Sequence, residues 1–181
     1  MDAKEAVKAL QEADCLYSDQ QVQAAMDKMA QEITATLATR DPLVLCVMTG
    51  GIIPAGQLLT RLNFPLQIDY IHATRYRGET TGSHLQWLVR PNHSLRGRQI
   101  LIVDDIYDEG VTLSEIVEYC WSEGAAEVYT AILINKLHDH KQPLKLDFVG
   151  LETPDRYLFG YGMDYKGYLR NAPGIYAVKG M

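Results

Sequence analysis

The chain has 181 residues, enough to bury one hydrophobic core without disulfides or a structural metal, and a single α/β domain is expected. Its 17 Lys and Arg residues are outnumbered by 23 Asp and Glu residues, which gives a net charge of −6. Because no basic run could follow a phosphate backbone, this balance argues against non-specific nucleic-acid binding. The start MDAKEAVKAL lacks the pattern of a signal peptide, and the apolar runs are too short to span a bilayer. We therefore expect a cytoplasmic protein that binds neither nucleic acid nor membrane.

The cysteines support the same compartment. Cys15, Cys46 and Cys120 are odd in number, widely spaced, and located at apolar positions of their segments. We expect buried free thiols, as in a reducing cytosol, and assign them no chemistry.

The first strong pattern along the chain predicts a long amphipathic helix. Ser18 and Gln21 have the spacing of a capping box. Apolar residues then recur at helical spacing, namely Val22, Ala25, Met26, Met29, Ile33 and Leu37. We expect this stripe to pack against the rest of the domain, with a helix contact in an oligomer as the alternative.

The middle of the chain alternates between apolar strands and helices. LVLCVM predicts a buried strand that ends at Gly50 and Gly51, and Pro54–Leu62 predicts a short helix. Two further strands are expected on either side of the polar segment RYRGETTGS.

The same alternation continues toward the C-terminus. A buried strand over Ile100–Val103 leads into a helix that ends before Gly124, and Val128–Ile134 is again a strand. This order predicts a parallel, doubly wound sheet, whose ligands bind beyond the carboxyl ends of the strands.

The segment ILIVDDIYDEGVTLSEI carries four carboxylates between that strand and the following helix. It is not a nucleoside-triphosphate loop, because Val111 occupies the position of the lysine. Free N–H groups at the helix start, with the Thr112 hydroxyl, can instead hold a phosphate monoester. Asp104 and Asp105 suit vicinal hydroxyls or Mg²⁺. Together these features indicate a sugar phosphate, with the acidic pocket of a receiver domain as the alternative.

The run LIVDDIYDEGVTL resembles the phosphoribosyl-diphosphate motif of the type I phosphoribosyltransferases. Other features resemble the hypoxanthine-guanine branch of that family. The paired glycines after Thr49 look like its pyrophosphate loop, RYRGETTG like the loop that closes over the site, and Lys136 like the lysine that meets the purine 6-oxo group. FVGLETPDRYLFGYGMDYKGYLR resembles the C-terminal hood over the base. The resemblance extends over about residues 43–178.

The resemblance implies one phosphoribosyltransferase domain over residues 1–181, with a central, mainly parallel sheet flanked by helices and a small C-terminal hood. N-terminal helices are expected over about residues 1–40, the core over 41–145, and the hood over 146–181 with a possible N-terminal contribution. A homodimer or homotetramer is also implied.

The implied function is purine salvage. A 5-phosphoribosyl group passes from its 1-diphosphate to N9 of hypoxanthine or guanine, giving IMP or GMP and pyrophosphate, with Mg²⁺ as cofactor. A preference for xanthine and a ligand-sensing regulatory protein on the same fold remain open. The presence of Asp108 and Lys136 and the acidic composition argue against the regulator.

The resemblance also implies roles for individual residues. Asp108 is the expected general acid or base at N7 of the purine. Residues expected to bind the diphosphate substrate are Asp104, Asp105, Asp108, Glu109, Gly110, Val111, Thr112, Thr49, Gly50, Arg75, Tyr76 and Arg170. Those expected at the purine are Lys136, Tyr157 as the stacking ring, Leu158 and Asp164, and Mg²⁺ is expected at Asp104, Asp105 and Asp164.

Two residues depart from the family pattern. Thr49 stands where the family commonly has a lysine that follows a cis peptide bond. Glu109 fills a position that is often neutral, and a carboxylate about 4 Å from a phosphate costs on the order of 4 kcal/mol at an effective dielectric near 20. We therefore expect its side chain to point to solvent. His138 and His140 flank Asp139 in a polar loop, where we expect them to lie in water rather than bind a metal.

Overall fold

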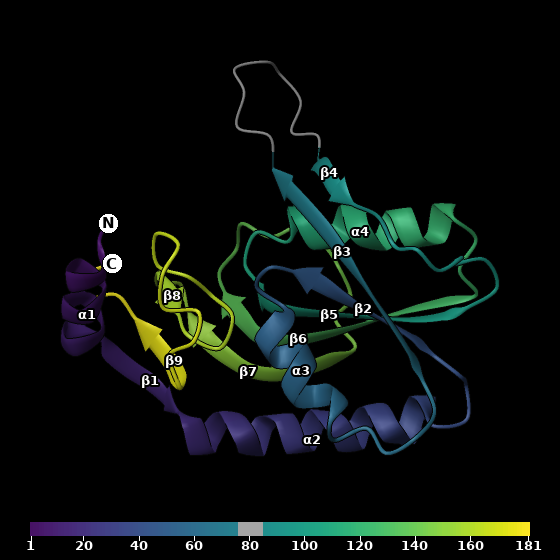
Figure 1. Cartoon of the computed structure of the whole chain (residues 1–181), viewed down its shortest axis with the longest axis horizontal. Helices are drawn as coiled ribbons and strands as arrows, with labels where there is room; N and C mark the ends of the chain where they lie inside the picture. The colour runs from purple at the N-terminus through teal and green to yellow at the C-terminus, as the bar shows by residue number, and fades with distance from the viewer. Residues whose placement is uncertain (76–84) are drawn as a thin grey trace.

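The computed structural model of this chain describes residues 1–75 and 85–181 and arranges them around two sheets (Figure 1). Of the segment RYRGETTG, which is expected to close over the site, Arg75 is described, and the rest, including Tyr76, lies outside the described residues. No helix within the described part of the chain is long and apolar enough to cross a membrane.

Six strands form the large sheet in the order β4-β3-β2-β5-β6-β7. They are β2 Leu43–Met48, β3 Gln67–Arg75, β4 Leu85–Val89, β5 Gln99–Tyr107, β6 Glu127–Leu137 and β7 Phe148–Pro154. All neighbouring pairs are parallel except β3 and β4, which are antiparallel. The expected α/β fold with a mainly parallel central sheet is confirmed.

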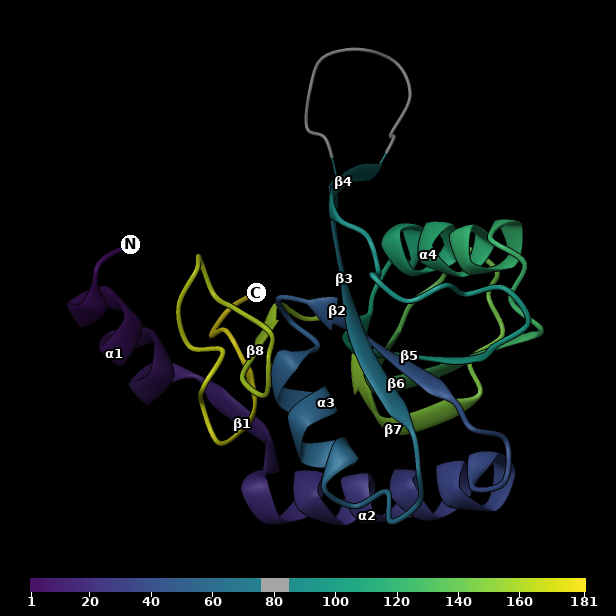
Figure 2. The same cartoon turned by 45° about the vertical axis from the view of Figure 1, so that its right-hand side comes forward.

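Helices cover both faces of this sheet, because alternate side chains of a strand point to opposite sides. The covering helices are α2 Asp19–Leu37, α3 Ile52–Leu59 and α4 Val111–Ser122, whereas α1 Ala3–Glu12 lies away from this sheet (Figure 1). Val44 and Cys46 of β2 belong to the hydrophobic cluster of α2 and α3, whereas Leu43 and Leu45 belong to that of α4. Figure 2 shows α4 on one side of the sheet and α2 and α3 on the other.

The long helix α2 agrees with its sequence pattern. Ser18 and Gln21 form both hydrogen bonds of the capping box. All residues of the apolar stripe are buried, namely Val22, Ala25, Met26, Met29, Ile33 and Leu37. The prediction that this stripe packs into the core is confirmed.

A small antiparallel sheet lies at the end of the molecule where α1 is found (Figure 1). It contains β1 Asp14–Ser18, β8 Leu158–Phe159 and β9 Gly174–Ala177 in the order β1-β9-β8. The sequence pattern did not predict β1, because this short edge strand is largely exposed and shows no apolar alternation. For the same reason Cys15 is exposed, and the expectation that it is buried was wrong.

Three element boundaries differ from the prediction, and two of them affect the site. β5 continues to Tyr107, so Asp104 and Asp105 lie within the strand instead of following it. β6 continues to Leu137 and therefore includes Lys136. The helix α3 begins at Ile52, since a proline at its third position is tolerated in the first turn.

Candidate active site

Two adjoining cavities lie near the carboxyl ends of β5 and β6. The first, here named the lysine cavity, is lined by Asp105, Ile106, Asp108, Lys136, Arg156, Tyr157, Leu158, Met163, Asp164 and Arg170. The second, the loop cavity, is lined by Val47, Met48, Gly50, Ala73, Asp104, Asp105, Ile106, Asp108, Glu109, Gly110, Thr112, Leu113 and Arg170. Their volumes are about 250 and 260 Å³. Together they fall within the range of small-molecule sites, roughly 300–1,000 Å³.

The loop cavity is built around the start of α4. Gly110 caps this helix with a left-handed backbone, φ 79°, and a Cβ atom there would lie 2.3 Å from the ring of Tyr107. Only glycine meets both conditions. The N–H groups of the first helical turn have no partner within the helix, so they can hold an anion beside Thr112. Glu109 is exposed but also lines the loop cavity, so the expectation that its side chain points away to solvent stays a prediction.

The turn after β2 forms another wall of the loop cavity. The peptide bond between Met48 and Thr49 is cis, the geometry that the family pattern associates with this position. A Cβ atom at Gly50 would lie 2.1 Å from a carboxylate oxygen of Asp105, so glycine permits the close approach of this turn. The paired glycines thus contact the strand that carries the buried carboxylates.

Asp104 and Asp105 form a buried pair of carboxylates. The Asp105 N–H donates to Asp104 Oδ1 at 2.9 Å, and the Ile106 N–H donates to Asp105 Oδ1 at 2.8 Å. Burial, and then the charge of Asp105, raises the pKa of Asp104 well above its ordinary value. Burial also raises the pKa of Asp105, although hydrogen bonding and the charge of Arg170 lower it in part. A cation or a pair of hydroxyl groups would stabilise the ionised pair.

The outer wall of the lysine cavity comes from the C-terminal region. Tyr157 is 45% exposed, lines the lysine cavity and forms a T-shaped pair with the ring of Tyr165. Arg170 bonds Asp164 Oδ1 at 2.6 Å through Nη2, and Asp164 Oδ2 accepts the Gly167 N–H at 2.7 Å. Arg170 lines both cavities.

Lys136 lies between two carboxylates in the lysine cavity. Its Nζ is 3.1 Å from Asp108 Oδ2 and 2.8 Å from Asp155 Oδ1. Burial would lower the pKa of Lys136, but hydrogen bonds to Asp155 and Asp108 raise it above its ordinary value. Lys136 therefore carries a full charge. An ammonium group has three donors, so one is left for a ligand carbonyl.

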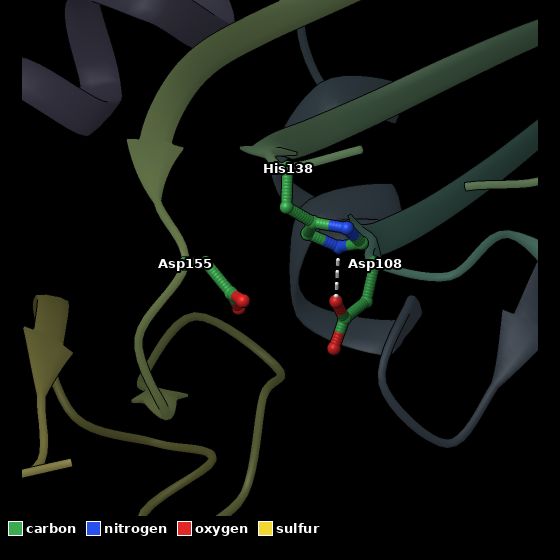
Figure 3. A group of neighbouring side chains, drawn as sticks. All are labelled: Asp108, His138 and Asp155. Atoms are coloured by element: carbon green, nitrogen blue, oxygen red, sulfur yellow. Dashed lines mark hydrogen bonds and ion pairs between the residues drawn. The ribbon is translucent and has the colours of Figure 1, made fainter. Parts of the chain in front are cut away.

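His138 does not lie in water, and the expectation for it was wrong. Its side chain is only 9% exposed, and Nε2 lies 2.8 Å from Asp108 Oδ1 (Figure 3). Strand alternation extended past Leu137 places Lys136 and His138 on one side, a signal that was present in the sequence. His140 is exposed, as expected. Asp155, the second partner of Lys136, had no such sequence signal.

The two cavities bring together most of the predicted site residues, and Asp105, Asp108 and Arg170 line both of them. Thr49 is exposed beside Gly50, and Val111 opens α4. Arg75 ends β3, and Tyr76 lies outside the described residues. Lining residues that the sequence did not suggest are Ile106, Arg156 and Met163 in the lysine cavity, and Val47, Met48, Ala73, Ile106 and Leu113 in the loop cavity.

The converging group of possible metal ligands among residues 1–75 and 85–181 is Asp108, His138 and Asp155, whose ligand atoms lie within 4.8 Å of one another (Figure 3). The Lys136 ammonium already bridges the two carboxylates of this group. The trio expected to bind Mg²⁺ is divided between the cavities, because Asp104 lines the loop cavity and Asp164 the lysine cavity.

Comparisons with known proteins identify the family of this chain. The model of the phosphoribosyl transferase domain matches residues 12–166. The hypoxanthine-guanine phosphoribosyltransferase of Bacillus subtilis (strain 168) is 32% identical over 91% of this chain and 92% of that protein. The hypoxanthine-guanine-xanthine phosphoribosyltransferase of Tritrichomonas foetus is 28% identical over 91% of this chain and 90% of that protein.

A solved structure shows the same fold. The hypoxanthine-guanine phosphoribosyltransferase from Bacillus anthracis str. 'Ames Ancestor' matches with a TM-score of 0.85 and 28% identity, over 91% of this chain and 98% of that one. Motifs, fold and relatives thus agree, and the chain belongs to the phosphoribosyl transferase domain family and, within it, to the hypoxanthine-guanine phosphoribosyltransferases.

Proposed function

We propose that this enzyme transfers a 5-phosphoribosyl group from 5-phosphoribosyl 1-diphosphate to N9 of hypoxanthine or guanine and releases pyrophosphate. The observation that carries the proposal is that Asp108 lines both cavities. A phosphate at the start of α4 and a purine beside Lys136 would therefore meet at one carboxylate. Named relatives with this activity support the assignment.

The chemistry assigns a task to each part of the site. As the bond from C1′ to the diphosphate breaks, positive charge develops on the ribose and negative charge on the leaving group. Asp104 and Asp105 face the ribose, and Arg170 supplies a cation for the leaving group. N9 forms the new bond to C1′, and Asp108 accepts the proton that leaves N7 of the purine.

Lys136 selects the base. With two donors directed to Asp108 and Asp155, its third donor can bond a 6-oxo group but opposes the 6-amino group of adenine. Tyr157 supplies the stacking surface and Leu158 lines the same cavity. Relatives include an enzyme that also takes xanthine, so a broader range of 6-oxopurines is part of the test.

Mg²⁺ is part of the proposal. The buried carboxylates of Asp104 and Asp105 are oxygen ligands of the kind that Mg²⁺ prefers, and magnesium is usually held by one or two carboxylates together with substrate oxygens. When bound, Mg²⁺ neutralises charge on the diphosphate. Both oxygens of Asp164 already have partners, so its contribution as a metal ligand stays a prediction.

A homo-oligomer is proposed as well. Ile68, Tyr70 and Leu88 expose apolar side chains on β3 and the edge strand β4, a surface that a second copy could cover. Light scattering after size-exclusion chromatography would test the assembly, and a monomer at micromolar concentration would contradict it. The cytoplasmic location stays a prediction.

Pyrophosphate release tests the proposed reaction. We expect Mg²⁺-dependent release with hypoxanthine and guanine and essentially none with adenine, and parallel reactions with xanthine define the range of bases. Tight binding of the ribosyl diphosphate without turnover of any purine would contradict the proposal and favour the ligand-sensing regulator.

A further inference from the structure

We propose that His138 is a positioning residue, which fixes the Asp108 carboxylate for proton transfer by donating a hydrogen bond as a neutral imidazole. This inference rests on the proposed function and extends it to a side chain outside the cavity linings. His138 follows β6 directly and reaches Asp108 on the loop after β5.

Asp108 needs such a partner because its side chain is 47% exposed. A carboxylate at this exposure can change its side-chain rotamer unless other groups hold it. His138 Nε2 contacts Oδ1 at 2.8 Å, and Lys136 Nζ contacts Oδ2 at 3.1 Å. Each oxygen thus has its own partner, and the orientation of the carboxylate is determined at two points.

Hydrogen bonding at the other ring nitrogen assigns the form of His138. The backbone N–H of His140 donates to His138 Nδ1 at 3.1 Å. An Nδ1 atom that accepts a hydrogen bond carries no proton, so the ring proton must be on Nε2. Nε2–H then donates to Asp108 Oδ1. A proton on Nδ1 would oppose the His140 N–H, so this geometry favours the neutral ring.

The segment that carries His138 is itself attached to the loop of Asp108. The Gln142 N–H donates to the carbonyl oxygen of Glu109 at 2.9 Å. The Tyr107 hydroxyl in turn donates to the carbonyl oxygen of Gln142. Residues 138–142 and 107–109 are therefore joined by three hydrogen bonds, and His138 holds Asp108 from a fixed support.

Without His138, Lys136 alone would have to orient Asp108 and bond the purine at the same time. Lys136 is also proposed to bond the incoming purine with its third donor, so its position depends on the bound base. The bond from His138 does not depend on the purine, so Asp108 keeps its orientation. A metal at Asp108, His138 and Asp155 is a poorer explanation, because it would have to displace the Lys136 ammonium.

Two substitutions and a control test this role. His138→Gln keeps an N–H donor near the position of Nε2, whereas His138→Leu keeps the bulk and removes the donor. His140→Ala is the control, because it retains the backbone N–H that bonds His138 Nδ1.

We expect His138→Leu to lower kcat about 10- to 100-fold, as for a small misplacement of a catalytic group. Its KM for the ribosyl diphosphate should stay within about threefold of the wild type, because the phosphate is held elsewhere. His138→Gln should recover most of the lost kcat, and His140→Ala should behave as the wild type. Wild-type kcat in His138→Leu, or equal losses in the Gln and Leu variants, would overturn the proposal.

A second measurement does not depend on turnover. ¹⁵N NMR of the imidazole nitrogens should show His138 as the Nε2–H tautomer in the ligand-free protein at neutral pH. The Nδ1–H tautomer or an imidazolium would overturn the assigned hydrogen bond even in an active enzyme. Conversely, a wild type that is inactive but shows the Nε2–H tautomer would contradict the proposed function. The hydrogen bond from His138 to Asp108 would then be present but would have no catalytic role.

Discussion

Two pairs of carboxylates in this site have opposite surroundings. Asp104 and Asp105 are adjacent in β5 and buried, and burial raises the pKa of both. Asp108 and Asp155 are about half exposed and share the Lys136 ammonium. Hydrogen bonding to Lys136 lowers the pKa of Asp155.

The difference indicates where each pair obtains its counter-charge. The pair at Lys136 contains its own cation and is organised before any ligand arrives. The buried pair has only the partial influence of Arg170, so its ionised form requires a cation or hydroxyl groups from outside. The proposed base site is thus preformed, whereas the proposed ribose site would be completed by substrate and metal.

The largest effect on turnover is expected from the pair of carboxylates at Lys136. Asp108→Asn retains the shape and an oxygen acceptor for His138 or Lys136, but it removes the proton acceptor. We expect kcat to fall by about 10²- to 10⁴-fold, while the KM for the ribosyl diphosphate changes little. Steady-state kinetics with hypoxanthine would measure this, and near-normal kcat would remove Asp108 from the chemical step.

Removal of the bridging cation should have the next largest effect. Lys136→Met keeps a stem of similar length and deletes the donor, so kcat/KM for hypoxanthine should fall about 5- to 150-fold, equivalent to 1–3 kcal/mol. The gap between hypoxanthine and adenine should narrow. Tyr157→Leu is the control, because loss of stacking should weaken both bases alike. Substantial adenine activity in the wild type would contradict the role of Lys136.

The buried pair can be tested through stability. Because the pKa of Asp104 is raised in the folded state, that state binds a proton more tightly than the unfolded chain does. Stability therefore falls as pH rises from about 4, the unfolded value, through the folded pKa. Asp104→Asn removes the cost of ionising this buried carboxyl group. Without Mg²⁺, the variant should therefore have a higher melting temperature than the wild type at pH 8, but not at pH 4. Each kcal/mol corresponds to about 2–4 °C at this chain length.

Asp155→Asn provides the matched control of opposite sign. The pKa of Asp155 is lowered in the folded state, so its contribution to stability is present above the unfolded pKa and is lost as pH falls. The variant should melt below the wild type at pH 8. If Asp104→Asn also melted lower at pH 8 without Mg²⁺, the proposed contrast between the two pairs would be wrong.

The smallest effect is expected at the turn after β2. Thr49 is exposed, so Thr49→Lys adds a cation beside the anionic leaving group in a largely solvated position. Inhibition by pyrophosphate should tighten by about 1.5- to 5-fold, the range of an exposed ion pair worth 0.2–1 kcal/mol. Thr49→Met controls for side-chain size. Unchanged or weaker inhibition would argue against the assignment of this turn to pyrophosphate.

The sequence alone determined the parts of this protein that are local. The stripe of α2 and its capping box, the buried strands, and the run from Asp104 to Thr112 depend on backbone hydrogen bonds and side-chain periodicity within a few residues. Most residues that line the loop cavity are close in sequence, so the proposal that it binds a phosphate could be made from the sequence.

Only the tertiary structure decided how distant segments meet. His138 and Asp155 reach Asp108 because β6 lies between β5 and β7 in the sheet, and pairing order is not encoded in local periodicity. The pairing of β1 with β9 likewise joins segments that are far apart in the sequence, since Asp14 pairs with Ala177. The exposure of Cys15 on β1 depends on this pairing. Side-chain environment is a property of these long-range contacts, which is why the charge balance of the two carboxylate pairs became visible only in the folded chain.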